Sequence, residues 1–271
     1  MYDMSSYSQE IEKLLAPPFE WCPITGGSVV LIDATDRGGT SGGVFAVRDF
    51  AISKYLITNA QFERFVEDPN GYTNQSWWEY SAQAMQWRQT RKKAQETAFS
   101  GTKLPRTRVS WFESMAFCAW LSQSFARSTS FSIHDVTTWA IRLPSEVEWQ
   151  RAALGDTSGP YPWGNAAVDE TRANCANWAM QPTDVDSHPT GASPYGVFDM
   201  SGNLAEWCLT KWGTDGQDVT GYDYRNARGG AWNSSAQNVF LQATDRFGHP
   251  PRGRLNDFGF RIGLYLQKDR H

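Results

Sequence analysis

The chain has 271 residues, a formal net charge of −4, 14% aromatic residues and 13 tryptophans. Its slight acidity argues against a basic face for nucleic acid, and no apolar run reaches the roughly 20 residues of a membrane span. The N-terminal stretch lacks the hydrophobic core of a signal peptide, and the four cysteines stand far apart without metal-ligand spacing. We therefore expect a cytoplasmic protein with reduced thiols. Because no repeat or low-complexity linker interrupts it, we also expect a single domain over residues 1–271.

The N-terminal part of the chain predicts one helix and several short strands. Residues 8–15 have an amphipathic pattern that a proline pair ends, which makes residues 1–18 a helical N-terminal extension. Loose alternation of apolar residues predicts strands within residues 19–32 and again within residues 44–52.

Three further helices are predicted from capping boxes, in which a hydroxyl side chain and a Gln or Glu three residues later satisfy free backbone N–H groups. The boxes are Thr58–Gln61, Ser110–Glu113 and Ser145–Glu148. Glu146 and Glu148 are two positions apart, so they lie on different faces of their helix and do not form an acid–base pair.

A polar stretch with interleaved tryptophans separates the first two of these helices. It covers residues 77–103 and contains a basic run at residues 88–93. A basic run beside aromatic residues resembles a nucleic-acid patch, but the overall acidity favours a solvated insertion between core elements.

The segment of residues 228–261 differs in composition from the rest. It begins with RGGAW and ends with GFR, and its glycine pair permits a tight backbone path that a Cβ would block. Residues 233–258 contain no Lys, Glu, Met or Trp and keep neither a helical nor a strand period. This is typical of surface loops with short strands, on the side of a molecule that meets other molecules.

Six motifs in a fixed order carry a family resemblance. They are residues 109–111 (VSW), 142–149 (RLPSEVEW), 161–164 (YPWG), 195–207 (YGVFDMSGNLAEW), 228–232 (RGGAW) and 259–261 (GFR). Together they resemble the formylglycine-generating enzyme, or sulfatase-modifying factor, family over roughly residues 19–264. The resemblance implies an α+β fold, an elaborated C-type-lectin-like fold with much irregular structure.

The enzymes of that family oxidise a substrate cysteine with copper, which a cysteine pair holds shortly after the Gly-Gly. Residues 233–239 (NSSAQNV) contain no cysteine, and Ser or Asn cannot replace the soft thiolates that copper(I) prefers. Related sulfoxide synthases use an iron site of several histidines, whereas this chain has four histidines without His-x-x-x-Glu spacing. On this resemblance we expect a chain that is not an enzyme and requires no cofactor.

A second resemblance concerns the same C-terminal segment. It is similar to the variable region of diversity-generating retroelement variable proteins, which share the lectin-like fold. The resemblance implies a hypervariable ligand-binding region at residues 228–261, with a macromolecule, a protein rather than a nucleic acid, as ligand. The candidate binding residues are Phe240, Leu241, Asp245, Phe247, His249, Gly253, Leu255, Asn256, Asp257 and Phe258. Phe258 is equally compatible with the core, and Trp232, Arg246, Phe260 and Arg261 are expected to be scaffold.

Calcium is a further implication of the family resemblance. Family members bind it through their Gly-Asn-x-x-Glu-Trp motif, which here supplies Asn203, Leu204 and Glu206. The alternative role of Glu206 is an ion pair with a buried arginine. Two other functions stay open: an oxidoreductase of the formylglycine-generating type, and a regulatory or assembly module of a larger signalling protein.

Overall fold

A four-stranded antiparallel sheet joins the two ends of the chain. The computed structural model describes residues 4–128 and 139–266. The strands of this sheet, in spatial order, are β1 (Trp21–Ile24), β4 (Phe50–Ser53), β10 (Gly263–Leu266) and β5 (Trp139–Arg142). Because β10 pairs with both β4 and β5, the last strand lies inside the sheet and fixes the end of the 228–261 segment.

A second four-stranded sheet carries the 228–261 segment itself. Its order is β8 (Phe247–His249), β7 (Arg225–Arg228), β6 (Ala205–Lys211) and β9 (Phe258–Gly259). All pairs are antiparallel except β6 with β9. Every residue of β6 is buried, so this strand is the fixed centre on which the loops between β7, β8 and β9 are arranged.

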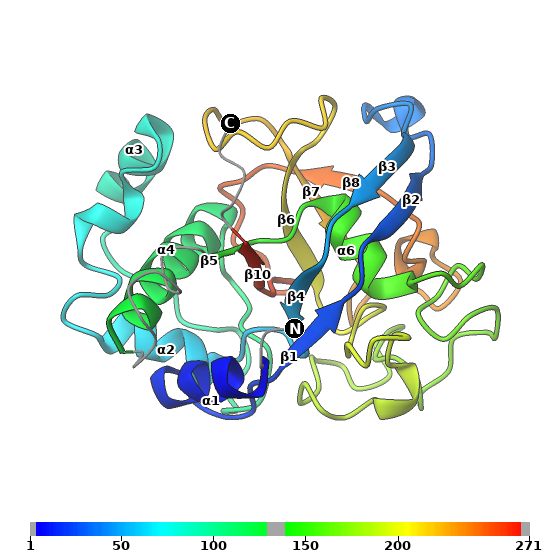
Figure 1. The fold of residues 1–271 in the computed structure, drawn as a ribbon, viewed down its shortest axis with the longest axis horizontal. Helices are drawn as coiled ribbons and strands as arrows, with labels where there is room; N and C mark the ends of the chain where they lie inside the picture. Colours follow the sequence, from blue (N-terminus) through cyan, green and yellow to red (C-terminus); the bar gives the residue numbers. More distant parts are fainter. Residues whose placement is uncertain (1–3, 129–138, 267–271) are drawn as a thin grey trace.

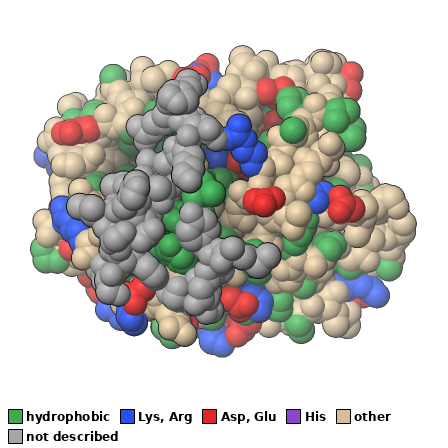
Figure 2. Space-filling model, viewed as in Figure 1, with side chains coloured by type: hydrophobic (Ala, Val, Ile, Leu, Met, Phe, Trp, Pro, Cys, Tyr) green, Lys and Arg blue, Asp and Glu red, His purple; other side chains and the backbone are tan. Residues whose placement is uncertain are grey.

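A separate two-stranded ribbon, β2 (Gly27–Leu31) with β3 (Gly43–Val47), lies at the edge of the molecule (Figure 1). Val30 and Val44 are cross-strand partners on its outer side and are 61% and 72% exposed. On the face seen in Figure 2, hydrophobic side chains are scattered among polar and charged ones.

The helices are α1 (Met4–Leu14), α2 (Asn59–Glu67), α3 (Ala82–Thr90), α4 (Trp111–Ser128) and α6 (Glu146–Leu154). Figure 1 shows α1 to α4 together on the left side of the molecule and α6 behind the β2–β3 ribbon.

The capping boxes form as the sequence predicts. The Thr58 hydroxyl accepts from the Gln61 backbone N–H, and Ser145 accepts from that of Glu148. In the third box the Ser110 N–H donates to Glu113 at 2.9 Å. Each box satisfies N–H groups that a helix end leaves free, which is typically worth about 1 kcal/mol.

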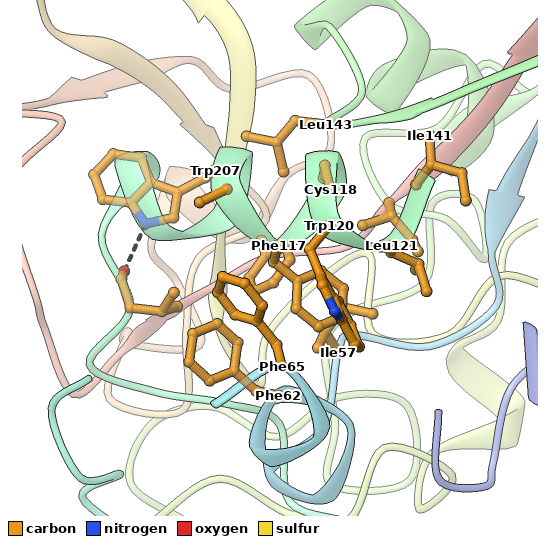
Figure 3. Close-up of a cluster of buried hydrophobic side chains, with 14 of the residues drawn as sticks. Ile57, Phe62, Phe65, Phe117, Cys118, Trp120, Leu121, Ile141, Leu143 and Trp207 are labelled. Atoms are coloured by element: carbon orange, nitrogen blue, oxygen red, sulfur yellow. Dashed lines mark hydrogen bonds between the residues drawn. The ribbon is translucent and has the colours of Figure 1, made fainter. Parts of the chain in front are cut away.

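Aromatic side chains build the core between the helices and the first sheet. Phe62 and Phe65 of α2 pack against Phe117 of α4, with ring centroids 5.8 Å apart in both pairs (Figure 3). Trp207 of β6 enters the same cluster, and its indole N–H donates to the Val109 carbonyl at 2.9 Å. A fully buried side chain of this size contributes roughly 1.5–3 kcal/mol, so a chain with short strands obtains its core from few large residues.

The segment of residues 77–103 is only in part the solvated insertion that its polar composition predicted: none of residues 88–103 is buried, but residues 77–87 contribute to the core. Trp77, Trp78 and Trp87 are buried in the main hydrophobic cluster, and Trp78 and Trp87 stack with centroids 5.7 Å apart. The polar residues between them face outward from α3 and its neighbours. In residues 4–128 and 139–266 no helix is both long and apolar enough to cross a membrane.

Candidate functional site

The 228–261 segment enters its sheet through a glycine pair, as predicted. Gly229 and Gly230 have φ of 89° and 65°, a left-handed backbone that favours glycine. A Cβ on Gly229 would stand 3.1 Å from the Trp149 ring, so the pair also permits close contact with α6.

Glu146 holds the first half of the segment. This buried carboxylate at the start of α6 accepts from Arg228 Nη1 at 3.1 Å. It also accepts from Arg246 Nε at 2.9 Å and from Arg246 Nη2 at 2.7 Å. Both arginines are fully buried, so one carboxylate fixes the ends of the loop between them.

Two further buried carboxylates hold the second half. Glu206 of β6 accepts from Arg261 Nε at 2.6 Å and from Arg261 Nη2 at 2.8 Å. Glu113 of α4 accepts from Arg254 Nε at 2.9 Å and from Arg254 Nη2 at 2.7 Å. The segment is therefore fastened at four arginines, and the residues between these points are presented by a rigid frame.

Seven of the ten predicted binding residues lie at least partly at the surface. Phe240 and Phe247 contact each other with centroids 4.9 Å apart. The exposed Asn233 donates to Asp257 at 3.1 Å. We call this surface the display face; its residues are Asn233, Phe240, Phe247, His249, Gly253, Leu255, Asn256 and Asp257.

Three predicted binding residues are instead interior. Leu241 is 0% exposed, Asp245 5% and Phe258 6%. Asp245 accepts from Arg37 Nη1 at 3.0 Å, and Phe258 packs on Trp207 with centroids 4.9 Å apart. Their side chains are buried and stabilise the segment from within. This corrects the prediction that they contact a ligand.

Arg108 also reaches the display face, although no sequence motif predicted this. Its Nε donates to Asn256 at 2.7 Å, and its backbone N–H donates to the Leu255 carbonyl at 2.8 Å. A positive φ of 53° turns Arg108 toward this loop, and a positive φ at an arginine cannot be read from composition.

Of the predicted calcium ligands Asn203, Leu204 and Glu206, Glu206 does not fit the ion. Both Glu206 oxygens accept from Arg261, and one also accepts from the Trp149 indole N–H at 2.9 Å. A guanidinium in that position repels a cation, so the alternative reading of Glu206 as the partner of a buried arginine is the one observed.

Other oxygens around Asn203 are buried and unpaired. Asn174 Oδ1, Thr183 Oγ1 and Asp199 Oδ1 are buried without a hydrogen-bond partner among the described residues. All three residues contact Asn203, and burial raises the pKa of Asp199 to about 7. Calcium binding at Asn203 and Leu204 stays a prediction, and these unpaired oxygens lie beside Asn203.

The soft and nitrogen ligands of the family's redox metals are not gathered at the display face. All four cysteines are buried and free, and burial raises the pKa of the Cys208 thiol well above its usual value. His249 is on the face, the buried His188 lies near Asp199, and His134 and His271 fall outside the described residues. Within residues 4–128 and 139–266, no three His, Cys, Asp or Glu side chains are grouped to hold a metal.

The sequence model of the sulfatase-modifying factor enzyme 1-like domain matches residues 16–264. This chain belongs to that family. Its α+β structure is the C-type-lectin-like fold of the sulfatase-modifying factor domain, as the sequence motifs predicted.

The proteins similar to this sulfatase-modifying factor domain include one named as an oxygenase, one named as an inactive enzyme and one named as a variable protein. A hercynine oxygenase of Mycobacterium tuberculosis is 29% identical over 243 residues, which cover 78% of this chain and 52% of that protein. An inactive C-alpha-formylglycine-generating enzyme 2 of Mus musculus is 28% identical over 268 residues, covering 84% and 79%. The solved structure of Treponema denticola variable protein 1 has a TM-score of 0.61 at 20% identity, covering 90% and 94%, and shows the fold alone.

These relatives correct the expectation that the chain is not an enzyme. Three hercynine oxygenases, which are enzymes by name, match it at 28–29% identity. The chain spans about half the length of these proteins. The family thus includes enzymes and a member named inactive, and the missing cysteine pair does not decide to which group this chain belongs.

Proposed function

We propose that this chain binds a macromolecular ligand, a protein, through its display face. The proposal rests on a contrast within residues 228–261 between ion-paired arginines, which hold the segment in place, and other side chains, which stay at the surface. Four arginines are bound to three buried carboxylates, while polar and aromatic side chains between them remain at the surface. A rigid frame lowers the entropy lost on binding, and partly exposed aromatic rings beside amides supply apolar anchors with directional contacts.

The finer proposal is that residues of this face are diversified, as the name of the variable protein with the similar fold suggests. The exposed Asn233 and Asn256 can change without opening the core, because neither side chain is buried. Sequencing the locus tests this directly. A near-repeat of the codons for residues 228–261, differing only at adenines and close to a reverse transcriptase gene, is expected; a locus without it contradicts diversification.

Binding itself is testable without knowing the natural ligand. Peptides selected from a random display library on the wild-type protein serve as probes. Asn256→Arg places a long cation in the middle of the display face, and Ser28→Arg makes the same change at an exposed position of β2.

We expect the selected peptides to lose most of their affinity for Asn256→Arg and to keep it for Ser28→Arg. Thermal unfolding of both variants controls for folding. If the peptides bind both variants equally well, the preferred binding surface lies elsewhere and the proposal is wrong.

A further inference from the structure

Basic side chains gather at the end of α3, outside the display face. Between Ala82 and Gln95 the chain has four cations and no carboxylate. A fifth cation comes from the loop after β8. We call this cluster the basic patch; its residues are Arg88, Arg91, Lys92, Lys93 and Arg252.

Contacts across the chain bring these two parts together. The Arg252 guanidinium stands 5.7 Å from the Tyr222 ring centroid, and the Tyr222 hydroxyl donates to Gln86 of α3 at 2.8 Å. Arg254 donates to the Lys93 carbonyl at 3.4 Å. These contacts place the loop that carries Arg252 beside α3 and the residues that follow it, although the two are far apart in sequence.

The cations of the basic patch lack carboxylate partners. Within residues 4–128 and 139–266, no ion pair involves any of the five, whereas their neighbour Arg254 is paired with Glu113. Arg88 donates to the carbonyls of Arg91 at 3.0 Å and Tyr72 at 3.3 Å, and its Nε is buried without a partner. A chain of net charge −4 therefore concentrates uncompensated positive charge at one place.

A depression of about 290 Å³ lies within the patch. Its lining residues are Thr73, Gln75, Met85, Arg88, Gln89 and Lys92. The amide, hydroxyl and cationic side chains among them are hydrogen-bond donors of the kinds that bind a carboxylate.

Three of the aromatic rings near the patch are too buried to stack with the bases of a nucleic acid. Trp87 is 4% exposed, and the guanidinium groups of Arg91 and Arg254 stand 5.6 Å and 4.8 Å from its centroid. Tyr72 and Trp78 are buried beneath Arg88. Bases bind single-stranded sites by stacking on open rings. These three rings are covered, which leaves Tyr222, 39% exposed and beside Arg252, as the open ring of the patch.

We propose that the basic patch docks an acidic peptide segment of a partner protein. The segment's carboxylates pair with the five cations, and one of them enters the depression beside Arg88 and Lys92. Four of the five cations belong to α3 and the loop that follows it, and the fifth, Arg252, adjoins the display-face residue Gly253 in sequence. Charge complementarity of this kind speeds association and weakens as salt is added.

The test measures fluorescence anisotropy of a labelled oligo-glutamate peptide at low salt. The variant Lys92→Glu is compared with Arg64→Glu, an exposed cation of α2 that has no ion pair among the described residues. Both substitutions change the net charge equally. We expect oligo-glutamate to bind the wild type, to weaken with salt, and to bind Lys92→Glu about fivefold more weakly, with less than about a twofold change for Arg64→Glu.

Three outcomes overturn the proposal: no binding of oligo-glutamate at low salt, an equal loss in both variants, or tighter binding of oligothymidylate than of oligo-glutamate. The last outcome assigns the patch to nucleic acid. Thermal unfolding of Lys92→Glu confirms that the fold is kept. The selected display-face peptides are measured in parallel on Lys92→Glu and Asn256→Arg, so failure of either proposal is recognised separately.

Discussion

Replacing Glu146 by Gln tests whether the buried carboxylates hold the display segment. Glu146 accepts three hydrogen bonds from Arg228 and Arg246, and all three side chains are buried. Removing one member of a buried pair typically costs about 3–5 kcal/mol, because the remaining charge stays buried without compensation. Glutamine keeps one acceptor oxygen, so we expect a loss near the lower limit, about 3 kcal/mol in the free energy of unfolding.

The measurement is urea denaturation at neutral pH together with thermal unfolding. A loss of about 3 kcal/mol corresponds to a fall in melting temperature of roughly 6–12 °C for a domain of this size. Glu20→Gln is the matched control, since Glu20 pairs with Lys54 at 2.8 Å in a largely exposed setting. Such a pair is worth about 0–1 kcal/mol. If Glu146→Gln destabilises no more than Glu20→Gln, the claim that the arginines anchor the segment is refuted.

Three further predictions follow from buried groups elsewhere. Burial raises the pKa of Asp199 from its usual 3.8 to about 7, so its contribution to stability is full below about pH 4 and is lost as pH rises toward 7. Asp199→Asn should remove this fall, which amounts to as much as about 4 kcal/mol, and urea titrations across that range should show a flatter profile. Millimolar calcium should raise the melting temperature of the wild type but not of Asp199→Asn, and an unchanged wild type contradicts the calcium prediction. Trp87→Ala should lower the free energy of unfolding by about 3–5 kcal/mol in urea denaturation. A loss below about 1 kcal/mol would contradict the burial of Trp87 in the core.

Local signals in the sequence predicted the helix starts well. A capping box needs only two residues three positions apart, and Thr58–Gln61 and Ser145–Glu148 form as expected. The glycine pair was equally informative, because few other residues adopt its backbone conformation. The motif order then identified the family and, with it, the fold.

Contacts between side chains distant in sequence could not be predicted from such local signals. Glu113 was predicted only as a helix cap, yet it also binds Arg254, which is 141 residues away. Trp87 of α3 is buried although its neighbours in sequence are polar, because it packs on Phe112 of α4 while Gln86 and Gln89 are exposed. The composition of a segment does not distinguish the buried side of a helix from its exposed side, so the polar residues hid the burial of the tryptophan.

The same reasoning limits which positions of the display segment can vary. Gly248 lies between Phe247 and His249, but a Cβ there would stand 2.3 Å from Cγ of the Trp212 ring, near the base of that side chain. Replacing Asp245 removes the buried carboxylate that accepts a hydrogen bond from Arg37. Under the proposed diversification, we therefore expect changes at the exposed side chains while these positions stay constant. If Gly248 or Asp245 varies as often as Asn256, the buried positions of the segment tolerate more substitutions than their ion pairs imply.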